Sequence, residues 1–217
     1  MTKSLTLSAR DIGKVFSGRT IISGISFSLE SRQSLGLTGP NGSGKSTLLK
    51  ILAGVLSPTS GIVALTEGGS GIPEGDRFRH IGFVAPYLQL YDEFTAMENL
   101  EFTDQIRGAG KSREELESLL ERVKLLPRKA DLVRTYSSGM KQRLKYAFAL
   151  VHKPPLLFLD EPASNLDRDG IAIVRDIILE QKSRGMVVIA TNDQEDLQFC
   201  DSVVSVDRAA GGGSHER

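Results

Sequence analysis

The chain contains 217 residues, which is enough for one large α/β domain with a substantial core but short for two independent domains. Lys plus Arg and Asp plus Glu number 27 each, so no overall charge would attract nucleic acid or an anionic membrane surface. The single cysteine, Cys200, excludes an internal disulfide and a cysteine metal cluster, and we expect a small buried side chain there. The chain lacks an apolar secretion signal and any run near the roughly eighteen apolar residues that span a bilayer, so we expect a soluble protein in a reducing compartment.

The first predicted elements are β-strands. Apolar residues alternate at Ile25, Phe27 and Leu29, which indicates antiparallel strands with one solvated face. Three later runs rich in Val, Ile and Leu predict parallel strands buried on both faces at the centre of a sheet: SLGLTG, LLFLD and MVVIAT. The Gly-rich segment TEGGSGIPEG predicts a surface loop.

Helical patterns follow in the second half. Ser112 and Glu115 form a capping box, and apolar residues then recur at helical spacing, at Leu116, Leu119, Leu120 and Val123. A second amphipathic helix is predicted after Asp169 and ends near Gly185, with a buried face made of Ile173, Val174, Ile177 and Ile178. We expect one domain over residues 1–208, with a helical subdomain at about 87–150, and a flexible tail over 209–217.

The strongest motif lies in SLGLTGPNGSGKSTLLKILAG, where G-x-x-x-x-G-K-[ST] stands between an apolar strand and a predicted helix. Its glycines lack Cβ atoms, so the loop can turn several backbone N–H groups toward phosphate oxygens, and the helix dipole adds its positive end. Lys45 would neutralise the β- and γ-phosphates, and the Ser46 hydroxyl would ligate Mg²⁺. The predicted nucleotide-binding residues are Gly39, Pro40, Asn41, Gly42, Ser43, Gly44, Lys45, Ser46 and Thr47.

A pair of carboxylates ends a buried strand in LLFLDEP. Asp160 is suited to a second Mg²⁺ contact, and Glu161 is suited to be the general base that activates water. The two residues would otherwise be helix caps.

The segment YSSGMKQRLKYAFAL resembles the LSGGQ signature of the ATP-binding cassette (ABC) family. The signature positions are occupied by Tyr136, Ser137, Ser138, Gly139 and Met140, of which Ser137 and Gly139 match. At a helix start these residues form a second anion site. In the family this site meets the γ-phosphate held by a partner cassette, so the resemblance implies a head-to-tail dimer of two cassettes on ATP and Mg²⁺. The resemblance extends over nearly the whole chain.

The resemblance assigns roles to further residues. Asp167, in ASNLD, stands where the family's D-loop lies at the dimer seam, and Phe16 stands where an aromatic ring stacks on adenine. An isolated Phe is more often part of the core, so both interpretations of Phe16 remain open.

Two positions depart from the family pattern. Pro86 stands where a glutamine normally contacts Mg²⁺ and water, with Gln89 three residues on, and Asn192 replaces the switch histidine beside the γ-phosphate. Asn can hydrogen-bond the phosphate but cannot take up a proton at neutral pH. With Glu161 present we expect a working ATPase, with Glu161 and Asn192 as its catalytic residues.

The resemblance implies an α/β P-loop NTPase core with a mainly parallel sheet, an N-terminal antiparallel β subdomain and an inserted helical subdomain. It implies the ATP-hydrolysing subunit of an export-type transporter, peripheral on the cytoplasmic membrane face through separate membrane-spanning subunits. The haem-exporter or cytochrome c maturation group and the ABC-2 exporters are the most similar subclasses. Exposed aromatics between Tyr87 and Phe94 would receive a partner helix, or would pack the helical subdomain.

Two other functions remain open. One is a soluble cassette without a transporter, such as an iron–sulfur assembly ATPase, and the other is a nonenzymatic nucleotide sensor. The transported substrate, and whether the dimer pairs two copies or two different cassettes, do not follow from the sequence.

Overall fold

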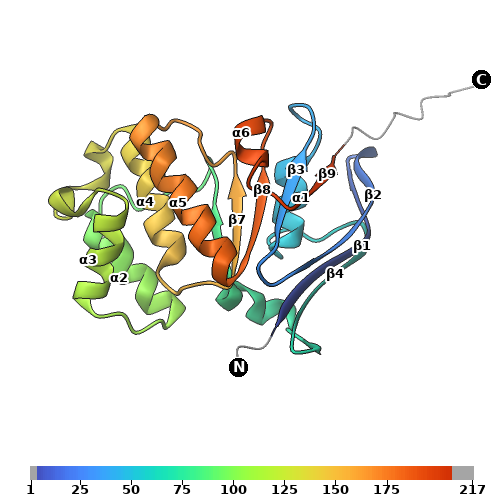
Figure 1. The fold of residues 1–217 in the computed structure, drawn as a ribbon, viewed down its shortest axis with the longest axis horizontal. Helices are drawn as coiled ribbons and strands as arrows, with labels where there is room; N and C mark the ends of the chain where they lie inside the picture. The colour runs from blue at the N-terminus through green and yellow to red at the C-terminus, as the bar shows by residue number, and fades with distance from the viewer. Residues whose placement is uncertain (1–3, 207–217) are drawn as a thin grey trace, which may run out of the picture.

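The computed structural model describes residues 4–206 and contains two β-sheets with helices around the second sheet (Figure 1). The first sheet is antiparallel, with strand order β2-β1-β4-β5. Its strands are β1 (Leu5–Phe16), β2 (Arg19–Glu30), β4 (Ser60–Glu67) and β5 (Ser70–Gly71). Leu29 is buried while Ile25 and Phe27 are partly buried, so the predicted antiparallel strand with a solvated face is confirmed.

The second sheet is parallel, with strand order β6-β7-β8-β3-β9. Its strands are β3 (Ser34–Thr38), β6 (Ile81–Val84), β7 (Leu156–Asp160), β8 (Met186–Ala190) and β9 (Ser202–Ser205). Ala190 pairs with both Leu37 and Asp160, so the carboxyl ends of β3, β7 and β8 meet at one edge of the sheet. This register brings the glycine-rich loop after β3 to the same edge as the carboxylates after β7.

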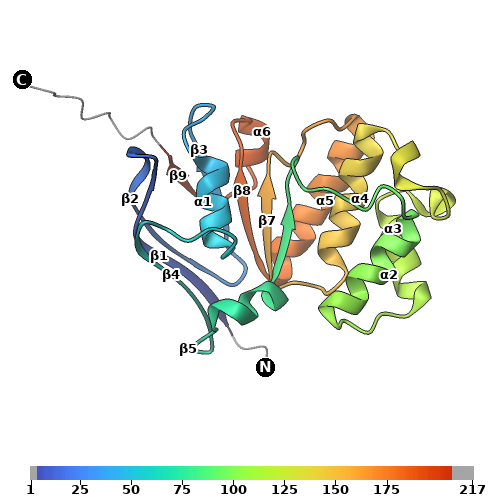
Figure 2. The same ribbon diagram turned by 180° about the vertical axis from the view of Figure 1, so that it is seen from behind.

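The longer helices are α1 (Lys45–Leu52), α2 (Ala96–Arg107), α3 (Arg113–Arg122), α4 (Ser138–Leu150) and α5 (Arg168–Arg184). The remaining helical segments are α6 (Gln194–Leu197) and the 3-10 turns η1 (Glu74–His80), η2 (Leu126–Arg128) and η3 (Val133–Thr135). The antiparallel sheet and helices α2 to α4 lie at opposite ends of the molecule, with the parallel sheet between them (Figures 1 and 2).

The central strands are buried on both faces because their side chains alternate between two hydrophobic cores. Leu156 and Phe158 of β7 pack with the antiparallel sheet and α1, whereas Leu157 and Leu159 pack with the helices α2 to α5. Each core therefore covers one face of the parallel sheet and fixes the helices on that face.

The predicted helices are present. Ser112 Oγ accepts a hydrogen bond from the Glu115 N–H at 3.3 Å, which confirms the capping box of α3. α5 buries all four of the predicted apolar residues and ends at Gly185, but it begins at Arg168 because Asp167 is its N-cap. Leu119 and Cys200 are only partly buried.

The structure differs from the sequence predictions in two segments. TEGGSGIPEG is not a plain loop, because Thr66 pairs with Gly71 and Glu67 with Ser70 across a two-residue turn. The turn residues, Gly68 and Gly69, both have positive φ (56° and 84°), which favours a tight hairpin. In the stretch after Tyr87 the first helix starts only at Ala96, behind a capping box formed by Thr95 and Glu98. The predicted tail at 209–217 lies outside the described residues.

Candidate functional site

The glycine-rich loop joins the end of β3 to α1. Gly39, Gly42 and Gly44 have φ values of 144°, 76° and 110°, which side chains with a Cβ rarely adopt. A Cβ at Gly39 would lie 2.4 Å from the Val206 carbonyl oxygen, so this position also has no room for a side chain. α1 has neither a side-chain cap nor an acidic residue in its first turn, so its N-terminal N–H groups and positive dipole end suit an anion.

Two side chains of the loop are buried although they are polar. Lys45 is 6% exposed, and its Nζ donates to the carbonyls of Gly39 at 2.7 Å and Pro40 at 3.4 Å. Ser43 Oγ is buried and finds no hydrogen-bond partner among the described residues. Burying a polar group costs free energy unless it is paired, and a phosphate oxygen would pair the Ser43 hydroxyl and neutralise the charge of Lys45.

Asp160 ends β7 beside this loop. Both of its carboxylate oxygens are buried and lack a hydrogen-bond partner within residues 4–206. The hydroxyls of Ser46 and Tyr87 lie beside the carboxylate, although neither has the distance and angle of a hydrogen bond. Burial raises the pKa of Asp160, and these hydroxyls, Lys50 and Lys45 act in the opposite direction. Two unpaired carboxylate oxygens next to a serine hydroxyl fit a Mg²⁺ ion, which prefers oxygen ligands.

Glu161 follows Asp160 in an unusual backbone conformation. Its φ is 47°, a value uncommon for a residue other than glycine, and its N–H donates to the Ala190 carbonyl at 2.8 Å. Burial raises the pKa of Glu161, Lys45 lowers it, and Asp160 adds to the increase. A carboxylate with a raised pKa is a stronger base for water than a free one.

Asn192, at the position of the switch histidine, contacts the glycine-rich loop of residues 39–47, called the phosphate loop below. Asn192 lies just after β8, and its Nδ2 donates to Asn41 Oδ1 at 2.6 Å. Asn192 is exposed, so its amide remains accessible at the loop edge. The structure thus brings Asn192 together with the loop, Asp160 and Glu161 at the carboxyl ends of three neighbouring strands.

The signature residues lie at the start of α4, apart from the glycine-rich loop. Ser137 caps α4, accepting a hydrogen bond from the Met140 N–H at 3.2 Å, and both Ser137 and Ser138 are exposed. The first turn of α4 contains no acidic residue. α4 packs on the face of the parallel sheet opposite to α1, as Figures 1 and 2 show. The two predicted anion sites are therefore not assembled into one within a single chain.

Two predicted residues have clear local surroundings. Phe16 ends β1, is 44% exposed and has the Lys14 ammonium 4.8 Å from its ring centroid, so it is not part of either core. Asp167 accepts the Gly170 N–H at 2.8 Å as the N-cap of α5. Asp167 is exposed.

The loop at the position of the missing glutamine contains a residue that the sequence analysis did not place in the site. Pro86 and Gln89 are exposed, and Lys145 Nζ donates to the carbonyls of Ala85 at 3.1 Å and Pro86 at 2.8 Å. Tyr87 follows with its hydroxyl beside Asp160, and the Lys50 ammonium lies 4.0 Å from its ring centroid. Burial and the Asp160 charge raise the pKa of Tyr87. In the sequence, only the position of Tyr87 next to Pro86 could have indicated its contact with Asp160.

Sequence comparison places the chain among known proteins. The family model described as ABC transporter matches residues 22–164. The linearmycin resistance ATP-binding protein LnrL of Bacillus subtilis is 35% identical over 93% of this chain and 66% of its own length. The uncharacterised ATP-binding protein YxlF of the same organism is 39% identical over 91% of this chain and 66% of its own length. The chain thus spans about two thirds of the length of these two relatives. The lantibiotic transport ATP-binding protein SrtF of Streptococcus pyogenes is 35% identical, with 86% and 79% covered.

Solved structures agree with this placement. The ATP-binding subunit of an ABC transporter superposes with a TM-score of 0.82 at 27% identity, covering 93% of this chain and 86% of the other. A dimeric cassette bound to ADP and phosphate after hydrolysis shares the fold, with a TM-score of 0.83 at 21% identity over 93% and 94% of the two chains. The P-loop NTPase fold, the antiparallel sheet and the helical region are those of such ATPases. The chain therefore belongs to the ABC transporter family as one of its ATP-binding cassettes.

Proposed function

We propose that the chain hydrolyses ATP as one of two cassettes that close head to tail, and that this closure drives export through separate membrane-spanning subunits. The observation that carries the proposal is the shared edge of β3, β7 and β8, where the buried Lys45 of the glycine-rich loop lies near Glu161 and near Asp160, whose carboxylate oxygens are unpaired. The names of two relatives refer to linearmycin resistance and lantibiotic transport, which supports an export role.

Each residue of the proposed site would have a separate role in phosphoryl transfer. Backbone N–H groups of the loop and Lys45 would hold the β- and γ-phosphates, and Phe16 would stack on adenine. Ser46 and Asp160 would hold Mg²⁺, which neutralises charge that develops on the phosphate oxygens. Glu161 would take a proton from the attacking water, and Asn192 would donate a hydrogen bond toward the γ-phosphate.

A second cassette would complete each site. Because α1 and α4 occupy opposite faces of the parallel sheet, the exposed Ser137 and Ser138 and the partly buried Gly139 and Met140 would reach the ATP of the partner rather than their own. Asp167 would lie at the seam between the two cassettes. The partner is a second copy or a different cassette.

The membrane subunits would dock on the aromatic residues of the loop before α2. Tyr91, Phe94 and Phe102 pack on one another, with centroids 4.9 to 5.9 Å apart, yet Tyr91 and Phe94 remain 46% and 36% exposed. A groove of about 280 Å³ opens beside them, lined by Phe78, Tyr91, Phe102, Thr103, Ile106, Arg107 and Phe148. Tyr91 and Phe94 thus pack the helical region and also present an apolar surface, whereas Tyr87 lies beside Asp160 and Lys50 instead.

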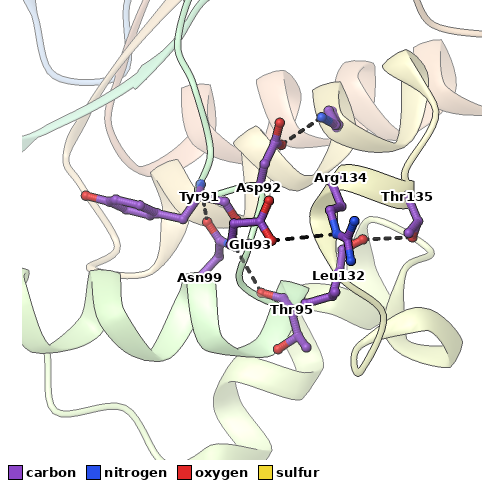
Figure 3. Close-up of polar contacts among 9 residues, drawn as sticks. Tyr91, Asp92, Glu93, Thr95, Asn99, Leu132, Arg134 and Thr135 are labelled. Carbon is purple, nitrogen blue, oxygen red and sulfur yellow. Dashed lines mark hydrogen bonds and ion pairs between the residues drawn. The ribbon is translucent and has the colours of Figure 1, made fainter.

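Polar contacts connect the loop of residues 91–95 to its neighbours, as Figure 3 shows. The Tyr91 N–H donates to Asn99 Oδ1 at 2.9 Å, and Asn99 Nδ2 donates back to the Tyr91 carbonyl at 3.0 Å. Glu93 pairs with Arg134 at 3.7 Å. Since no helix among residues 4–206 is long and apolar enough to cross a bilayer, association with the cytoplasmic membrane face would depend on the partner subunits.

Copurification tests the transporter assignment. The tagged chain is isolated from detergent-solubilised membranes, its partners are identified, and ATP hydrolysis is measured with and without them. We expect an integral membrane protein that is lost in the Tyr91→Ala, Phe94→Ala double variant but kept in Leu179→Ala, which changes an exposed apolar residue on α5. A stable complex with soluble proteins alone would contradict the transporter, and ATP binding without turnover in the complete complex would contradict the ATPase.

A further inference from the structure

Tyr146 is a buried tyrosine in the middle of α4, the helix that opens with the signature residues. Its side chain is 0% exposed, and its hydroxyl donates to the Pro162 carbonyl at 2.8 Å. Burial raises the pKa of Tyr146 well above its ordinary value, so the phenol stays protonated and remains a donor. A buried phenol needs a hydrogen-bond partner. Because the acceptor here lies outside α4, the bond connects the helix to another segment.

The accepting residue adjoins the proposed general base. Pro162 directly follows Glu161, and proline has no N–H, so its carbonyl is its only backbone group for a hydrogen bond. Glu161 itself is fixed on both sides, since its N–H donates to Ala190 at 2.8 Å and its carbonyl accepts from Ser164 at 3.1 Å. The positive φ of Glu161 can persist only when the surroundings hold it. Tyr146 supplies one of these contacts from a separate helix.

The start of α4 also lies against the loop between Glu161 and Asp167. A Cβ at Gly139 would be 3.0 Å from the Asn165 carbonyl oxygen, so α4 meets the loop between Glu161 and Asp167 near its first turn as well as at Tyr146. A shift of α4 would therefore displace this loop. The signature end of α4 would serve the partner's ATP, whereas Glu161 would serve the chain's own ATP.

We propose that Tyr146 is a positioning residue, which holds the Glu161 carboxylate in place through Pro162 and transmits movement of the signature helix to it. The proposal rests on the ATPase function proposed above. It predicts that the Tyr146 hydroxyl affects the rate of hydrolysis and leaves ATP binding unchanged, because Tyr146 contacts neither the phosphate loop nor the nucleotide stacking position.

The test is Tyr146→Phe, which removes only the hydroxyl. Steady-state hydrolysis by the purified full chain should show kcat reduced about fivefold, which corresponds to about 1 kcal/mol, with KM for ATP and the affinity for a fluorescent ATP analogue unchanged. Ser34→Ala is the control for loss of a fully buried hydroxyl, because Ser34 Oγ contacts the Phe199 carbonyl at 2.8 Å and also Asp201. Ser34 begins β3, at the sheet edge opposite to the site, so this variant should lose stability but keep kcat.

A double variant separates positioning from general loosening. In a Glu161→Gln background, Tyr146→Phe should not lower the remaining slow hydrolysis further, because the residue acts through Glu161. An unchanged kcat in Tyr146→Phe, a parallel rise in KM, or an equal loss in Ser34→Ala would overturn the role of Tyr146 while leaving the ATPase proposal intact. Absence of hydrolysis in the wild-type chain and in its membrane complex would instead overturn both.

Discussion

At the scale of single residues, the site combines buried polar groups that the described chain does not satisfy. Asp160 lacks partners for both carboxylate oxygens, and Ser43 lacks one for its hydroxyl. Such groups usually lower stability, and a ligand that carries negative oxygens together with a cation would pair them, as proposed above. The residue pattern around Glu161 and Asn192 leads to two predictions about the chemistry.

Glu161→Gln should produce an ATP-bound dimer with almost no turnover. The amide keeps the size of the side chain but cannot accept the proton of the attacking water, and general-base catalysis typically contributes about 10²- to 10⁴-fold. Phosphate release measures turnover, and gel filtration with ATP detects the dimer. Glu180→Gln, at an exposed carboxylate on α5, should behave like the wild type. Unchanged phosphate release in Glu161→Gln would remove Glu161 from the role of base.

Asn192→His should keep or raise the hydrolysis rate. An imidazole retains hydrogen-bonding capacity toward the γ-phosphate and can also take up a proton near neutral pH. Asn192→Ala removes the side-chain amide that contacts Asn41 and should lower kcat about fivefold, the effect of losing one hydrogen bond. Both rates are measured at saturating ATP. Complete loss of activity in Asn192→His would contradict this interpretation of the position.

At the scale of the elements, helix starts determine where the functional side chains lie. Ser137 is a typical N-cap and also a signature residue, because a cap places its neighbours at the helix N-terminus where N–H groups are free for an anion. α1 differs, since Gly44 precedes it without a side-chain cap, so its first-turn N–H groups would be available to the proposed phosphate. Asp167 and Ser112 cap α5 and α3 in the ordinary way.

Ser112→Ala should lower the free energy of unfolding by about 1 kcal/mol, because the first turn of α3 loses its accepted hydrogen bond. Denaturant titration measures this change. Ser118→Ala, at an exposed position inside the same helix, is the control and should be neutral or slightly stabilising, since alanine has the higher helix propensity. An equal loss in both variants would show that the cap does not account for the effect.

At the scale of the whole molecule, two hydrophobic cores pack on the opposite faces of the parallel sheet. This arrangement places α1 and α4 on opposite faces, which is consistent with the proposal that the glycine-rich loop of one chain and the signature residues of another act together. The end of α4 is also tied to the sheet, since His152 lies just after it and its Nε2 contacts the Ile81 carbonyl at 3.1 Å.

His152 should make the folded chain sensitive to mild acid. Burial, with Arg107 and His80, lowers its pKa to about 4, and its Nδ1 is buried without a partner in the described part of the chain. The unfolded chain binds a proton near pH 6.5 and the folded chain does not until about pH 4, so stability falls as pH decreases between these values. His152→Gln should reduce this fall in thermal unfolding measured from pH 7.5 to 4.5. An identical pH dependence in both proteins would contradict the assignment.

Much of this protein follows from local sequence. The apolar runs of β3, β7 and β8, the capping box of α3 and the phosphate loop depend on backbone conformation and on neighbours within a few residues, so their patterns are visible in the chain. The hairpin at Gly68 and Gly69 is also local, and the turn chemistry of two glycines would have indicated it. The late start of α2 depends on Thr95 and Glu98, a second capping box that the sequence also contains.

The sequence by itself thus determined the family, through the signature, and predicted where a nucleotide phosphate site would lie. Only the tertiary structure decided which side chains surround that site. Asn192 and Asn41 are 151 residues apart, Tyr87 reaches Asp160 across a loop, and Tyr146 reaches Pro162 from another helix. These contacts depend on strand order and on the packing of two cores, in which distant segments are brought together by burial of apolar surface. No local pattern encodes that packing, because each segment is compatible with many neighbours until the whole sheet is formed.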